Sequence, residues 1–166
     1  MNSKVGKQAA LGAVAGAAGT ALIQGMMAGS QRFAPQTLPP IKKDPGEFFV
    51  EQAEKILPER VREQIPEKAH KSVAGSLGFF YGATFGVLYA AMCARRRSSL
   101  TARVLMDGAA LGTGTWAVGY LGWLPATRLM PPVWEQEPKQ VVPGILSHVV
   151  FGIATVGLFK LLAKRV

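Results

Sequence analysis

Three glycines stand four residues apart inside one apolar segment: Gly78, Gly82 and Gly86 in AGSLGFFYGATFGVLYAAM. On a helix this spacing places all three on one stripe, which leaves a groove where side chains would otherwise stand. In water, each glycine in a helix costs about 1 kcal/mol relative to alanine. In a bilayer, the groove lets a second helix approach until the two backbones touch. The stripe therefore predicts a membrane protein with close helix contacts.

Four stretches have the length and apolar character of membrane spans, at about 9–29, 74–94, 104–124 and 141–162. Each is close to the roughly 20 residues that cross a hydrocarbon core. We therefore expect one all-α integral membrane domain, residues 1–166, with a long outer loop at about 30–73. The first stretch has a second interpretation, a cleaved signal peptide whose basic start is Lys4 and Lys7. Its length and its glycine pairs favour a retained helix.

Small-residue faces, typical of a glycine zipper, recur in all four stretches. The glycines that we expect at helix contacts are Gly12, Gly16, Gly78, Gly82, Gly86, Gly108, Gly112, Gly144 and Gly152. Residues 9–12 and 109–112 both read Ala-Ala-Leu-Gly, and a proline pair follows each of those two stretches. Two parallel helix pairs that arose by duplication would give this match. Chance in an Ala- and Gly-rich sequence gives it too, so both interpretations stay open.

Charged residues lie beside the apolar stretches and determine the expected orientation. The net charge is +9, and purely basic groups occur near both termini and in the link that contains Arg95, Arg96 and Arg97. The positive-inside rule places these three sites in the cytoplasm. A basic face with interleaved aromatic residues is missing, so we expect no nucleic-acid partner. The lone Cys93 excludes an intrachain disulfide, and no Cys and His spacing indicates a metal site.

The long loop contains a predicted amphipathic helix. Asp44, Pro45 and Glu47 have the spacing of an N-cap, a first-turn proline and a capping-box acid. Apolar residues follow at helical spacing: Phe48, Phe49, Ala53, Ile56 and Leu57. Pro58 and Pro66 then interrupt the helical run. The helix either lies on the membrane surface or caps the bundle; alternatively, it docks a partner outside the membrane.

Two ionisable residues inside the apolar stretches are candidate functional groups. His148 lies on a stripe with Gly144 and Gly152, and Asp107 follows Arg103 by four residues. Such groups are functional candidates because burying their charge in a membrane is costly. Structural roles compete, since His148 can hydrogen-bond across helices and Asp107 can pair with Arg103. The chain has no grouping of a nucleophile with a base and no phosphate-binding loop, so we expect no catalytic residues and no cofactor.

The last quarter of the chain is similar to a known family. It resembles the YagU-like bacterial inner-membrane proteins in two segments and in its basic end. The segments are residues 130–135, Met-Pro-Pro-Val-Trp-Glu, and residues 145–151, Ile-Leu-Ser-His-Val-Val-Phe. Ser147 stands where that family has a glycine before its histidine. The resemblance implies a multi-helix bundle in the bacterial inner membrane, and it implies no mechanism. The matched positions are Pro131, Pro132, Trp134 and His148.

Three functions stay open, and the glycine faces favour the first. It is a structural or interaction protein, an accessory or assembly subunit whose partners are the lipid bilayer and other membrane subunits or a second copy. The second is a small transporter or channel that acts as an oligomer and is proton-linked through His148. The third is an enzyme of membrane lipids, which would need His148 or Asp107 for activity.

Overall fold

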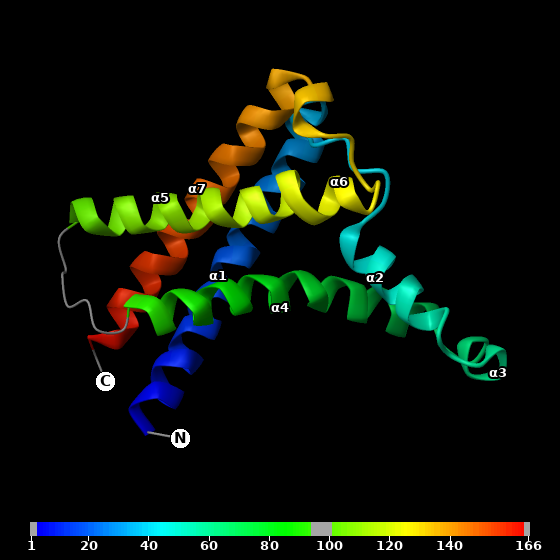
Figure 1. Ribbon diagram of the computed structural model, residues 1–166, viewed down its shortest axis with the longest axis horizontal. Coiled ribbons are helices and arrows are strands. Elements are labelled where there is room, and N and C mark those ends of the chain that lie inside the picture. The colour runs from blue at the N-terminus through cyan, green and yellow to red at the C-terminus, as the bar shows by residue number, and fades with distance from the viewer. Residues whose placement is uncertain (1–2, 94–100, 165–166) are drawn as a thin grey trace.

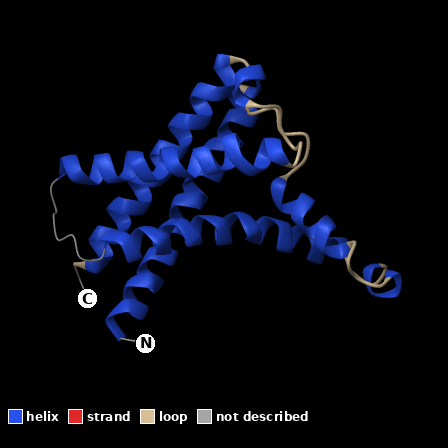
Figure 2. Cartoon of the chain, in the orientation of Figure 1, coloured by secondary structure: helices blue, strands red, loops and turns tan. Residues whose placement is uncertain are grey.

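The computed structural model describes residues 3–93 and 101–164, and this part of the chain is helical apart from short loops and turns (Figure 2). Three helices are long and apolar enough to cross a membrane: α1 (Ser3–Phe33), α4 (Glu67–Cys93) and α7 (Pro138–Ala163). An all-α fold with membrane-helix character is thereby confirmed. All three helices extend beyond the predicted spans at their N-terminal ends, because polar residues there continue the helical backbone.

The predicted third span is not among these helices. Residues 104–124 fall on α5 (Thr101–Ala117) and on the π-helical segment η2 (Val118–Trp123). Gly122 departs from helical geometry, with φ −102° and ψ −107°, and the one-turn helix α6 (Leu124–Ala126) follows. With 17 residues, α5 alone covers roughly 25 Å, less than the hydrocarbon core. Only α5 and η2 together have the length of a span.

The long helices form two crossed pairs. α1 crosses α4, α5 crosses α7, and α1 and α7 pack against each other in the middle (Figure 1). Both termini, the end of α4 and the start of α5 lie on one side of the molecule. The opposite side carries α2 (Pro45–Glu54), α3 (Glu59–Arg62), α6 and the short turn η3 (Val133–Glu135). All four long helices therefore run between the same two sides.

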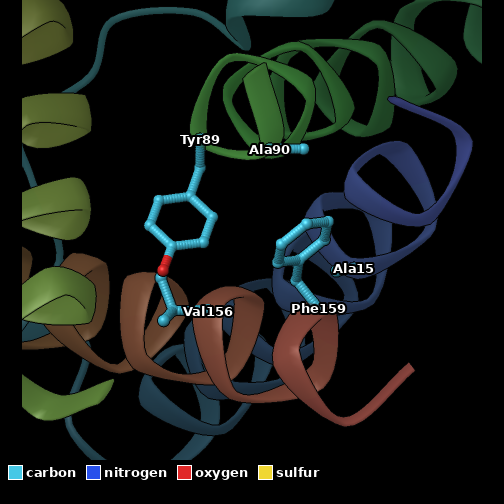
Figure 3. Packing of buried hydrophobic residues seen from close by; sticks show 5 residues of the cluster. All are labelled: Ala15, Tyr89, Ala90, Val156 and Phe159. Carbon is cyan, nitrogen blue, oxygen red and sulfur yellow. The ribbon is translucent and has the colours of Figure 1, made fainter. Parts of the chain in front are cut away.

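A buried cluster joins the two pairs where α1, α4 and α7 meet. It contains Ala15, Tyr89, Ala90, Val156 and Phe159 (Figure 3). The Phe159 ring packs edge-on against Tyr89 with 5.6 Å between ring centroids. Ala15 and Val156 are fully buried, and the small side chain of Ala15 lets α1 approach α7 closely.

The predicted helix in the long loop is present as α2. Asp44 is its N-cap, and the carboxylate accepts a hydrogen bond from the Glu47 backbone N–H at 3.0 Å. Pro45 occupies the first turn, where its missing N–H needs no partner. The predicted N-cap at Asp44 and the first-turn proline at Pro45 are confirmed. α3 and α4 begin directly after Pro58 and Pro66, so both prolines interrupt the helical run where expected.

α2 packs against the bundle. Gly46 lies against the backbone of Ala74 on α4, and Val50 is buried. The Phe49 ring contacts Trp123 of η2 with 5.3 Å between centroids. α2 therefore packs on the bundle, as expected of a helix that caps it.

Candidate functional site

The α1–α4 crossing is built on four glycines. Gly12 lies opposite Gly86, and Gly16 lies opposite Gly82; a Cβ added at Gly12, Gly16 or Gly86 would overlap the carbonyl oxygen across the interface. Thr20 fills the space beside Gly82, and its hydroxyl donates to the Gly16 carbonyl at 3.1 Å. The two backbones are therefore in direct contact, as small residues spaced four apart permit.

The α5–α7 crossing has the same kind of contact. A Cβ at Gly112 of α5 would overlap the His148 carbonyl oxygen of α7, and one at Gly152 would overlap the Gly108 carbonyl oxygen. Gly108 itself lies against the backbone of Ile153. Backbone contact again requires the absence of side chains at these positions.

The two crossings correspond contact by contact. Gly16 against Gly82 corresponds to Gly112 against His148, and Gly86 against Gly12 corresponds to Gly152 against Gly108. Gly12 of α1 therefore matches Gly108 of α5. The shared Ala-Ala-Leu-Gly motif would instead match Gly12 with Gly112, which lies one helical turn further along α5. His148 occupies the place of Gly82 in the first pair. The two helix pairs therefore have the same kind of crossing, but its register differs from that of the Ala-Ala-Leu-Gly match.

Gly78 and Gly144 lie outside the tightest contacts. A Cβ at Gly78 would be 3.4 Å from Gln24 Nε2, and one at Gly144 would be 3.5 Å from the Tyr120 ring. These distances are those of ordinary side-chain contacts or only slightly closer. Of the three glycines in the α4 stripe, Gly82 and Gly86 are the two that lie at the crossing.

Aromatic side chains surround His148 on the α5 side. Trp116 and Tyr120 are buried and stack with 5.6 Å between centroids, and His148 meets Tyr120 edge-on at 5.5 Å. His148 Nδ1 lies 2.8 Å from the Gly144 carbonyl oxygen. Because a carbonyl only accepts, Nδ1 carries the proton, and Nε2 of the neutral ring is left as an acceptor. This aromatic–histidine cluster holds α5 against α7 and contains one group able to take up a proton.

A second polar cluster joins three helices at the end nearer the termini. Lys160 Nζ on α7 donates to Asp107 Oδ2 on α5 at 3.2 Å, and the Tyr89 hydroxyl on α4 donates to the same oxygen at 3.1 Å. The Lys160 and Asp107 side chains are only 14% and 17% exposed. The expected pairing of Asp107 with Arg103 is wrong, because the crossing of α5 and α7 brings Lys160 to the carboxylate.

Neither Lys160 nor Tyr89 is among the residues that the sequence predicts to have a functional role. One pattern points to Lys160, because it interrupts the apolar run of α7 one turn before the helix ends. A lysine inside a span usually has an acidic partner or reaches the interface. Its pairing with Asp107 required the arrangement of the helices.

The remaining predicted residues lie at the loops. Trp134 in η3 is 79% exposed, and the Pro131 carbonyl accepts a hydrogen bond from Gln136 Nε2 at 2.7 Å. Pro132 is the N-cap residue of η3. The predicted topology residues Arg95, Arg96 and Arg97 fall outside the described residues. Within residues 3–93 and 101–164, no three His, Cys, Asp or Glu side chains gather as a metal site would require.

Comparison with protein-family models, with curated proteins and with solved structures gives no match to this chain. Two features of the geometry bear on function: the helix crossings with backbone contact, and the surfaces that these crossings leave uncovered.

Proposed function

We propose that the chain is an integral membrane structural protein, an accessory or assembly subunit that packs against other membrane proteins or a second copy of itself. One observation carries this proposal. Residues 21–28 of α1 are exposed on nearly every side of the helix, with only Ile23 partly covered. These residues belong to one of the candidate spans. Residues 21–28 therefore have fewer neighbours within the chain than the preceding turns of α1, where Ala15, Gly16, Gly19 and Thr20 are buried.

The composition of this part of α1 suits a partner helix. Gln24 is exposed there, and a Cβ at Gly25 or Gly29 would meet nothing within 4 Å. An amide in lipid gains from a hydrogen bond to another helix, and small residues allow that helix to approach closely. Exposed Leu22 and Met26 supply apolar surface for the same contact.

The crossings support a packing role over conduction. Backbone atoms touch at the centre of both helix pairs, as the glycine contacts of α1 with α4 and of α5 with α7 show. The ionisable groups there are engaged, since Asp107 is paired with Lys160 and His148 Nδ1 bonds to Gly144. Nothing in these contacts provides a polar path along the helices.

Site-specific photo-crosslinking tests the proposal. A photoreactive residue at Met26, in the native membrane, is expected to give a protein adduct, whereas one at Leu88, exposed on α4, is not. Gly25→Leu should remove the Met26 adduct because the leucine side chain fills the space that Gly25 leaves for a partner helix. Gly114→Leu is the matched control, since Gly114 also has nothing within 4 Å. Lipid adducts alone at Met26 would contradict the proposal.

A small proton-linked transporter is the second candidate, and one observation favours it. The buried Trp116 Nε1–H has no acceptor among the described residues, and it lies in the cluster that contains His148. A buried donor without a protein partner can hydrogen-bond a water molecule or a solute, and histidine is the side chain best suited to proton exchange near neutral pH. If proton and solute flux in proteoliposomes is the same for His148→Ala and for the unmodified chain, this candidate is eliminated.

We further propose four spans, with α5 and η2 as the third, in the bacterial inner membrane with both termini cytoplasmic. Membership of the YagU-like family is part of this proposal. Support comes from the basic residues near both termini and from the position of both ends on one side of the molecule (Figure 1). Reporter fusions after residue 166 and within the 30–73 loop test it. Cytoplasmic activity of the loop fusion would contradict it.

A further inference from the structure

The arm formed by residues 56–65 projects from the bundle. Whereas α2 packs against α4, α3 lies at the far end of the molecule, away from the crossed helices (Figure 1). Its apolar side chains are uncovered: Ile56 is 85% exposed, Val61 47% and Leu57 40%. Exposed apolar side chains with charged residues around them mark a surface that contacts a membrane or another molecule.

The arm lies where a membrane span begins. The α4 candidate span starts at Glu67, directly after the arm and Pro66. Strongly exposed aromatic residues stand near two other span ends: Phe33, at the end of α1, is 80% exposed, and Trp134, just before α7, is 79% exposed. α3, the end of α1 and the start of α7 all lie on the side of the molecule opposite the termini (Figure 1). Aromatic residues at span ends are typical of the lipid–water interface.

Charge near the arm is complementary to lipid phosphates. Five basic and three acidic residues lie between positions 55 and 71, so the segment has a positive balance. Lys68, Lys71, Ser72 and Glu67 line a surface pocket at the start of α4. Lys71 pairs with Glu67 at 2.6 Å, which leaves Lys68 and the Ser72 hydroxyl to meet an anion. Ammonium and hydroxyl donors are suited to a phosphate group.

We propose that this arm lies in the headgroup layer of the leaflet opposite the termini, with Ile56 and Val61 directed toward the acyl chains. Lys68 and Ser72 bind the phosphate of a lipid headgroup beside it. This inference rests on the proposed insertion of the chain in a membrane, and it names the lipid surface as the partner of the arm. Pro58 interrupts the arm and Pro66 follows it, and its only helix, α3, is one turn long, so the arm is short enough to lie flat without entering the hydrocarbon core.

Depth-dependent fluorescence of the full chain tests this. In a Cys93→Ser background, a polarity-sensitive dye is attached at Val61→Cys, at Glu59→Cys on the same arm, or at Leu88→Cys within α4. Each variant is placed in phosphatidylcholine–phosphatidylglycerol vesicles that carry spin labels at the headgroup or deep in the acyl chain. The dye at Val61 should show blue-shifted emission and be quenched by the headgroup label. The dye at Leu88 should be quenched by the deep label. The dye at Glu59 should be quenched more weakly by both labels. Lys68→Glu should reduce the quenching at Val61 in these anionic vesicles.

The outcomes separate the inference from the function on which it rests. Water-like emission at Val61 with deep quenching at Leu88 would overturn the inference while insertion stands. Water-like emission at both positions would overturn insertion itself. Emission at Val61 that is water-like in vesicles but blue-shifted in native membranes would replace the lipid surface with a protein partner and so also overturn the inference.

Discussion

Lys160 on α7 donates a hydrogen bond to Asp107 on α5 at 3.2 Å, and their separation of 53 positions makes this a contact that only the folded chain forms. Because both side chains are largely buried, neither charge is well hydrated. Asp107→Ala leaves the Lys160 ammonium without its partner and should lower the free energy of unfolding by about 3 kcal/mol. Unfolding in mixed micelles with increasing SDS measures this.

The double variant Asp107→Leu with Lys160→Leu is the control for that experiment. It removes both charges and replaces them with apolar side chains, which is often neutral for buried ion pairs. We expect it to be more stable than either single variant. If Asp107→Ala and the double variant unfold at the same SDS fraction, the pair has no coupling and the interpretation is wrong.

Gly16→Ala should destabilise the chain because its methyl group would overlap the Gly82 carbonyl oxygen on α4. Overpacking of this kind costs about 1–3 kcal/mol. Gly114→Ala is the matched control on α5, since nothing lies within 4 Å of its Cβ position. It should be neutral or stabilise by up to about 1 kcal/mol. The same SDS titration measures both, and equal effects would show that the crossing is not where the structure places it.

The sequence predicted local features well and distant contacts poorly. The Asp44 cap and the breaks at Pro58 and Pro66 were predicted because each depends on residues a few positions apart. The π-helical segment η2 was not, since its residues have the same apolar pattern as an α-helix. The Asp107–Lys160 pair was missed for a different reason: helical spacing relates residues on one helix and carries no information on which helices cross.

Arg128 has a left-handed backbone, with φ 60°. It follows the last turn of α6, where the Arg128 and Leu129 N–H groups donate to the carbonyls of Pro125 and Leu124 at 2.9 and 3.1 Å. These two bonds form a Schellman motif, whose left-handed residue is usually glycine. Arg128→Gly should therefore stabilise the chain by about 1 kcal/mol, as measured by thermal unfolding in detergent. A lower midpoint than that of the unmodified chain would show that the arginine side chain contributes more than the strain costs.

The docking of α2 should respond to acid. The Lys43 ammonium, hydrogen-bonded to Glu51, holds the pKa of that carboxyl below its ordinary value of 4.5. A lowered pKa stabilises the docked helix above pH 4.5, and this contribution is lost as the pH falls through the lowered value. Trp123 fluorescence reports the change, because Phe49 of α2 packs on that ring. In Glu51→Gln this acid transition should be absent; if it persists, another group causes it.

Purification of the protein from its native membrane in a mild detergent, followed by native mass spectrometry, tests the central claim most directly. The chain has a mass of 17.7 kDa. The uncovered part of α1 predicts a larger species, in which the chain is bound to a second copy or to another membrane protein. Gly25→Leu should dissociate that species, because the leucine side chain occupies the space that Gly25 leaves for a partner helix. A species of 17.7 kDa with no companion, obtained from membranes that were never solubilised harshly, would contradict the account.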